Sequence, residues 1–155
     1  MAERLVHAEV CAGGSLSMTH WVEQYLECEY EDGARGPDKH DCWSLVRTVI
    51  RDNLNGRELP SWGHVRHTMP RLFTRAYKAE AASMERCRPE VGAIAAVFRG
   101  ALMVHVGVCI EVDGRIVVLE MNPVSGVRWR SVRDFEAPYA KVLYYRDRPS
   151  IPEQA

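Results

Sequence analysis

Apolar residues recur at helical intervals in the first half of the chain. Residues 18–28 carry them three and four positions apart, which predicts a helix. After a polar, glycine-containing loop, a second apolar stripe predicts a helix that begins after Asp41, an N-cap residue, and ends at Asn55-Gly56. A third helix is expected from Pro70 to about Arg86, because proline suits the first helical turn.

The second half has the pattern of β-strands. Apolar residues alternate along 103–112, and Asp113-Gly114 is a strong signal for a two-residue hairpin turn into a strand at 115–122. Arg128 and Arg130 predict an edge strand with its charges toward water. Helices followed by antiparallel strands predict an α+β domain, with N-terminal helices packed on a C-terminal antiparallel β-sheet. The other strands are expected at 93–98, 126–132 and 140–146.

Composition and charge fit one globular domain. The 155 residues are 46% hydrophobic and 26% charged, with a net charge of −1, so nucleic acid is not expected as a partner. No apolar run approaches the ~20 residues of a membrane span, and no signal peptide is recognised at the start. We expect an N-terminal arm at 1–17, the domain at 18–146 and a C-terminal tail at 147–155.

The cysteines do not suggest a disulfide framework. There are five of them, an odd number with wide gaps, which favours free thiols in a reducing compartment. None of the cysteines and histidines has the short spacing of a structural zinc site, so neither a metal nor another cofactor is expected.

Cys42 is the strongest candidate for chemistry. It follows Asp41 at the expected start of a helix, where the helix dipole and unpaired backbone N–H groups favour a thiolate. His105 lies on the expected strand at 103–112, on which Val104, Val106, Val108 and Ile110 are expected to share one face. A cysteine at a helix start and a histidine on a strand indicate a cysteine peptidase of the papain type.

The hairpin register decides which side chains can reach His105. A two-residue turn places Gly107 opposite Glu120 and His105 opposite Asn122, all on one face. Glu120 is then diagonal to His105, ~7–8 Å away between Cα atoms, within reach of a long side chain. Either Glu120 or Asn122 can therefore orient the imidazole as the third member of a triad.

These residues resemble a known family, the NlpC-type cell-wall cysteine peptidases. That family has a tyrosine in a glycine-rich loop, Asp-Cys opening a helix, His-Val-Gly on a strand and a polar residue on the next strand. Glu120 stands where the family has its third residue, and the resemblance covers about Thr19 to Arg146. The matching residues are Tyr30 with Gly33 and Gly36, Asp41-Cys42-Trp43-Ser44-Leu45-Val46, and His105-Val106-Gly107-Val108.

One branch of the family is the most similar. The pattern Asp-Gly-x-Arg-Gly-Pro-Asp-x-x-Asp-Cys-Trp at 32–43, and the later Glu58-Leu59-Pro60, look like the branch found in bacteriophage tail assembly proteins. The resemblance implies a component of the virion tail tip that helps to open the cell wall, with other tail-tip proteins as partners.

The resemblance also implies a papain-like fold and the hydrolysis of peptide bonds in peptidoglycan stem peptides. It makes Cys42 the nucleophile and His105 the base, with Glu120 as the orienting residue and Asn122 as the alternative. Tyr30 and Asp41 are the expected oxyanion or substrate-binding residues, beside the backbone N–H of Cys42.

Other functions remain open at this stage. The family usually has glycine where Ser44 stands, Gly-Asp where Gly92-Ala93 stands, and histidine more often than glutamate at the third position. The chain can therefore also be a structural tail-tip or tail assembly subunit that retains the peptidase fold with little or no activity. A papain-like acyltransferase or a secreted toxin would use the same dyad.

Overall fold

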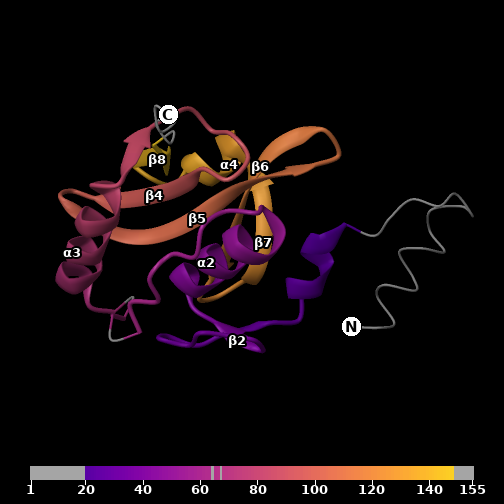
Figure 1. Cartoon of the computed structure of the whole chain (residues 1–155), viewed down its shortest axis with the longest axis horizontal. Coiled ribbons are helices and arrows are strands. Elements are labelled where there is room, and N and C mark those ends of the chain that lie inside the picture. Colours follow the sequence, from indigo (N-terminus) through magenta and orange to yellow (C-terminus); the bar gives the residue numbers. More distant parts are fainter. Residues whose placement is uncertain (1–19, 64, 67, 149–155) are drawn as a thin grey trace, which may run out of the picture.

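A six-stranded antiparallel sheet forms the centre of the molecule, with helices on both of its faces (Figure 1). The computed structural model describes residues 20–63, 65–66 and 68–148. This architecture is the α+β class expected from the sequence. Across the sheet the strands lie in the order β3 (Met84–Arg86), β8 (Lys141–Asp147), β4 (Ile94–Arg99), β5 (Leu102–Val112), β6 (Arg115–Asn122) and β7 (Gly126–Ser131).

Two longer helices cover one face of the sheet. Helix α2 (Cys42–Asn53) packs on β5 and β6, and helix α3 (Pro70–Ala81) packs on β5. The apolar stripe of α2 supplies the contact, because Leu45, Val46 and Val49 are fully buried in the larger of two hydrophobic cores. Asn55, at a φ of 58°, ends this helix as expected.

The other face carries a smaller core. Helix α4 (Val132–Glu136) packs on β6 and β7, and buries Phe135 against Val118 and Cys109. β6 therefore separates two cores, with Leu119 facing α2 and Val118 facing α4.

The N-terminal part of the described chain is less regular than expected. Within the helix predicted at 18–28, the structure has a short 3₁₀ helix η1 (Trp21–Tyr25). It is followed by a two-stranded parallel ribbon of β1 (Glu29–Tyr30) and β2 (Lys39–His40). The N-terminal arm expected at 1–17 lies outside the described residues, as do residues 149–155 of the expected tail.

The helix expected to reach Arg86 ends at Ala81. The residues that follow form β3 and pair with β8, and the Met84 side chain becomes buried in the larger core. Tertiary pairing has overridden the local helical pattern here. β8 itself continues to Asp147, one residue beyond the expected end of the domain, where Asp147 forms an ion pair with Arg57 at 2.9 Å.

The predicted hairpin register is confirmed. Asp113 and Gly114 have φ values of 51° and 76°, as a two-residue hairpin turn requires, and Val112 pairs with Arg115. The same register continues to Val108 opposite Leu119.

A β-bulge lies directly before His105. Val97 pairs with His105 while Phe98 pairs with Met103, so Val104 is the extra residue on β5. The expectation that Val104 shares a face with Val106 is therefore wrong: Val104 packs against the smaller core and Met103 takes the place on the α2 and α3 face.

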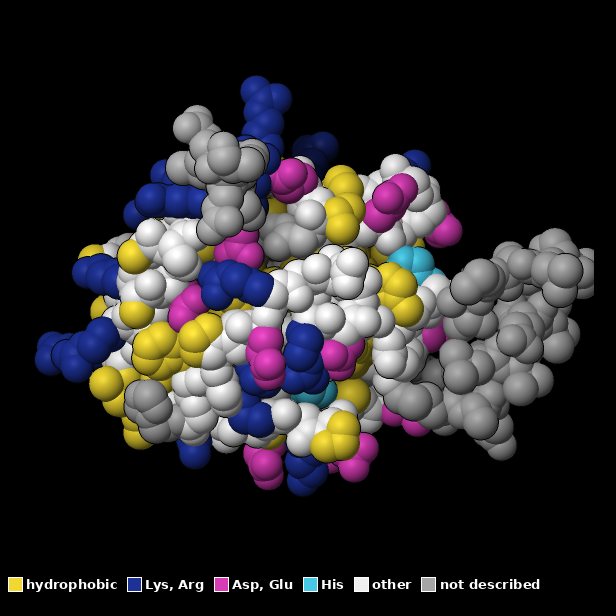
Figure 2. Space-filling view, viewed as in Figure 1, with side chains coloured by type: hydrophobic (Ala, Val, Ile, Leu, Met, Phe, Trp, Pro, Cys, Tyr) yellow, Lys and Arg dark blue, Asp and Glu magenta, His cyan; other side chains and the backbone are white. Residues whose placement is uncertain are grey.

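The surface of the molecule mixes charges of both signs. Figure 2 shows lysine and arginine side chains interspersed with acidic ones, while hydrophobic side chains gather around the start of α3. Met69 and Leu72 are among the exposed apolar residues of this region. Among the residues that the structure describes, no helix has the length and apolar character needed to cross a bilayer.

Gly107 allows β5 and β6 to approach closely beside His105. A Cβ atom at this position would lie 2.7 Å from Val118 Cγ1 and 2.9 Å from the Leu119 carbonyl oxygen. We expect Gly107→Ala to lower the free energy of unfolding by about 1–3 kcal/mol, because overpacking forces the strands apart. Urea denaturation measures this. Gly63→Ala is the matched control, since its Cβ would meet only Ser61 Oγ at 3.6 Å. Equal stabilities for the two variants would contradict the prediction.

Candidate active site

Asp41 and Cys42 form the start of α2. Asp41 is the N-cap, as expected, and its Oδ1 accepts a hydrogen bond from the Ser44 backbone N–H at 2.8 Å. Cys42 is the first residue of the helix and is only 1% exposed. The thiol is thus held at the helix start against the sheet.

Burial dominates the acidity of the Cys42 thiol. Loss of solvation, reinforced by the negative charge of Asp41, raises the pKa of Cys42 to about 12, although backbone hydrogen bonds from Val106 and Trp43 act in the opposite direction. The position at the helix start predicts a thiolate favoured by the helix dipole. The structure instead favours the neutral thiol at neutral pH, so a base must remove its proton during any reaction.

The contact with Val106 places the sulfur beside the strand that carries the candidate base. Val106 follows His105 directly on β5, and its backbone hydrogen-bonds the Cys42 sulfur. Neighbouring residues on a strand point to opposite faces: Val106 belongs to the larger core with Cys42, whereas the His105 ring lies 6.3 Å from the ring of Phe135 in the smaller core.

His105 and Glu120 form a buried pair. His105 Nε2 lies 2.9 Å from Glu120 Oε1, and Glu120 is 0% exposed. An ionised carboxylate only accepts hydrogen bonds, so the imidazole N–H donates. The other candidate for this contact, Asn122, is directed elsewhere: its Oδ1 accepts from the backbone N–H groups of Val124 and Ser125 in the turn after β6. Of the two expected orienting residues, the structure brings Glu120 to His105.

Arg128 is a site residue that the sequence pattern did not reveal. It was expected to face water on an edge strand; β7 is indeed an edge strand, but Arg128 Nε lies 3.2 Å from Glu120 Oε2. Burial alone would raise the pKa of Glu120, yet its hydrogen bond to His105 and the charges of His105 and Arg128 outweigh burial and lower it. No local pattern marks Arg128, because its contact depends on the register of β6 with β7, which places it opposite Glu120.

Tyr30 lies in the electrostatic environment of the thiol. Its pKa is raised by burial first, and then by the negative charges of Asp32, Cys42 and Asp41. The phenol therefore stays protonated and can donate a hydrogen bond.

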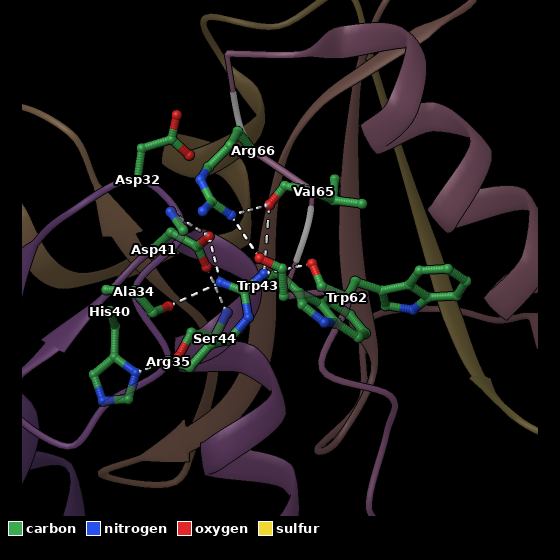
Figure 3. A network of polar contacts seen from close by, with 12 residues as sticks. Asp32, Ala34, Arg35, His40, Asp41, Trp43, Ser44, Trp62, Val65 and Arg66 are labelled. Carbon is green, nitrogen blue, oxygen red and sulfur yellow. Dashed lines mark hydrogen bonds and ion pairs between the residues drawn. The ribbon is translucent and has the colours of Figure 1, made fainter.

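Asp41 is tied into a network that joins two loops to the start of α2 (Figure 3). Its Oδ2 accepts from Arg35 Nη1 at 2.6 Å and from the Gly33 N–H at 3.1 Å. Arg35 also donates to the carbonyl oxygens of Ser61 and Trp62, at 2.9 and 2.8 Å. Both carboxylate oxygens of Asp41 thus accept hydrogen bonds within the protein, and its expected contact with oxyanion or substrate stays a prediction.

Ser44 is accommodated beneath the site by His40. The Ser44 hydroxyl and His40 Nδ1 are 2.7 Å apart in a buried contact, and burial lowers the pKa of His40. The extra hydroxyl at this helix position is therefore satisfied by a hydrogen bond.

An apolar cavity adjoins these residues. It has a volume of about 40 Å³ and lies between α3, the loop around Trp62, and strands β4 and β5. Trp43 and Val106, which follow Cys42 and His105 in sequence, both line it. The cavity is thus a small, largely apolar space close to the start of α2.

The described residues include no group of three or more His, Cys, Asp or Glu side chains arranged to hold a metal ion. A scan against models of known protein families finds no match, and a search of curated proteins finds none either. The geometry of the site and the sequence resemblance therefore carry the functional argument.

Proposed function

We propose that the chain is a cysteine peptidase that hydrolyses peptidoglycan stem peptides and is carried in a bacteriophage tail tip. The observation that carries the proposal is the buried pair of His105 on β5 and Glu120 on β6, together with the contact between the Cys42 sulfur and the backbone of Val106, which follows His105. A thiol, an imidazole and an orienting carboxylate are the three groups that this chemistry needs. The arrangement of α2 against an antiparallel sheet supports a papain-like fold as the finer description.

The proposed reaction begins with proton transfer. Glu120 holds His105 through Nε2. The proposed proton transfer therefore requires Nδ1 to reach the Cys42 thiol, which lies in the core on the α2 face. The sulfur then bonds to the scissile carbonyl carbon, and the electron pair of the carbonyl moves to oxygen. The backbone N–H of Cys42, at a helix start without an intrahelical acceptor, and the Tyr30 hydroxyl supply hydrogen bonds to this oxyanion.

Collapse of the tetrahedral intermediate breaks the carbon–nitrogen bond. His105 gives its proton to the leaving amine, and a thioester with Cys42 remains. Water, deprotonated by His105, attacks the thioester and releases the carboxylic acid, which restores the thiol. The depressed pKa of Glu120 keeps its carboxylate ionised, so that it can stabilise the imidazolium in both steps.

Mass analysis of peptidoglycan digests tests the proposal. We expect the full chain to release soluble fragments in which one stem-peptide bond has gained a water, leaving one new amine and one new carboxyl end. Incubation without protein is the control. A digest identical to the control would contradict the proposal.

Burial of the thiol supports the second candidate function, a structural tail-tip subunit with little or no activity. Cys42 is 1% exposed and its pKa is raised to about 12, which disfavours a reactive thiolate in this conformation. An unchanged digest, together with assembly into tail particles, would favour this alternative.

A further inference from the structure

We propose that Arg128 is a positioning residue of the candidate triad, which fixes and charges the Glu120 carboxylate that orients His105. The inference rests on the proposed function and deepens it, because it adds a fourth side chain to the site. Arg128 touches none of the proposed reacting atoms and would act only through Glu120.

The geometry places Glu120 between two nitrogen donors. His105 Nε2 meets Oε1 at 2.9 Å from β5, and Arg128 Nε meets Oε2 at 3.2 Å from β7. Each carboxylate oxygen thus has its own donor, and the carboxyl group cannot rotate without losing one of them. Arg128 Nη1 also donates to Ser125 Oγ at 3.1 Å, which fixes the direction of the guanidinium.

The register of the sheet makes this contact part of the fold. Glu120 and Arg128 are directly opposed on β6 and β7, where oppositely charged side chains attract. Glu120 has no exposed surface, whereas the Arg128 side chain is 35% exposed. The guanidinium therefore covers a buried carboxylate from the solvent side and supplies its second counter-charge.

The charged and titratable groups around Glu120 come from three elements. They are His105 on β5, Arg128 on β7, and Tyr139 after α4, whose pKa is raised by burial and by the charge of Glu120. Among them Arg128 holds a permanent positive charge. Glu120 can thus stay ionised before His105 gains a proton as well as afterwards.

The sign of the pH effect follows from this arrangement. The pKa of Glu120 is lowered in the folded protein, and Arg128 is one of the causes. Removing the guanidinium raises that pKa, so Glu120 becomes protonated at a higher pH. A protonated carboxyl no longer stabilises the imidazolium, and the acid limb of the pH profile of kcat/KM must move to higher pH.

Arg128→Gln tests the proposal, with Arg128→Lys as a second variant. In ¹³C NMR titrations of the side-chain carboxyl groups, we expect Glu120 to titrate at higher pH in Arg128→Gln than in wild type. With peptidoglycan as substrate, we expect kcat/KM on the acid limb to fall about 10-fold. This loss is smaller than the ~10²–10⁴-fold rate increase that general-base catalysis supplies. Lysine keeps the charge without the planar fork, so Arg128→Lys should restore the titration more fully than the rate.

Arg115→Gln is the matched control, because Arg115 is exposed at the hairpin turn and the variant loses the same charge. A Glu120 titration that is the same in wild type and Arg128→Gln overturns the proposal, as does a shifted titration with an unchanged pH profile. A wild-type protein that hydrolyses no stem peptide overturns the proposed function instead. The carboxyl titration then still decides whether Arg128 controls the charge of Glu120.

Discussion

Replacing Cys42 with serine is expected to lower the rate of stem-peptide hydrolysis by at least about 10³-fold, because removal of a nucleophile leaves only binding and oxyanion contacts. Serine is close to cysteine in size, so the packing at the start of α2 should be kept. Its hydroxyl is much harder to deprotonate than a thiol, so we expect a site built for a cysteine nucleophile to activate it poorly. Release of soluble fragments from purified peptidoglycan, followed over time at equal protein concentrations, gives the two rates.

The matched control is Cys109→Ala. Cys109 is also a fully buried free thiol, but it packs in the smaller core on the α4 face of the sheet. Its loss should reduce stability slightly and leave the rate of hydrolysis within a few-fold of wild type. Equal rates for wild type and Cys42→Ser would end the peptidase proposal, whatever the control shows.

Asp41→Ala is expected to lower the free energy of unfolding by about 3–5 kcal/mol, since removal of one partner leaves a largely buried charge without compensation. The side chains of Arg35 and Asp41 are only 19% and 4% exposed, and their contact is 2.6 Å long. The variant also loses the N-cap of α2, which contributes about 1 kcal/mol. Urea denaturation monitored by circular dichroism measures the total.

Two further variants separate these contributions. Asp52→Ala removes an exposed carboxylate of the same helix that forms an ion pair with its neighbour Arg51 at 2.7 Å, and it should change stability by no more than about 0.5 kcal/mol. Arg35→Met combined with Asp41→Ala should be less destabilised than Asp41→Ala alone, because no buried charge is left over. A loss below about 1 kcal/mol for Asp41→Ala would show that the network in Figure 3 contributes little.

Local patterns in the sequence were sufficient to predict the elements that carry the site. The spacing of apolar residues predicts α2, and Asp41 before Cys42 predicts its cap. Asp113-Gly114 fixes the register of β5 with β6, and from that register Glu120 comes within reach of His105. These features depend on residues close together in the chain, so the sequence alone contains them.

The remaining features arise from contacts between distant segments. The bulge at Val104 and the conversion of 84–86 from helix to strand depend on partners across the sheet. The raised pKa of Cys42 depends on how deeply the packed sheet buries it, which overrides the helix dipole. Arg128 has the sequence pattern of an ordinary surface residue on an edge strand. Only the pairing of β6 with β7 places it opposite Glu120.

The two halves of the candidate site have different origins in the chain. His105 and Glu120 are 15 residues apart on one hairpin, whereas Arg35, which anchors the start of α2, reaches carbonyl groups as far as 30 residues away. Closing long loops costs more conformational entropy than closing a hairpin. When the molecule opens only in part, the start of α2 with Cys42 should therefore separate first, while His105 and Glu120 stay paired. Heat or denaturant should then abolish activity before the sheet unfolds.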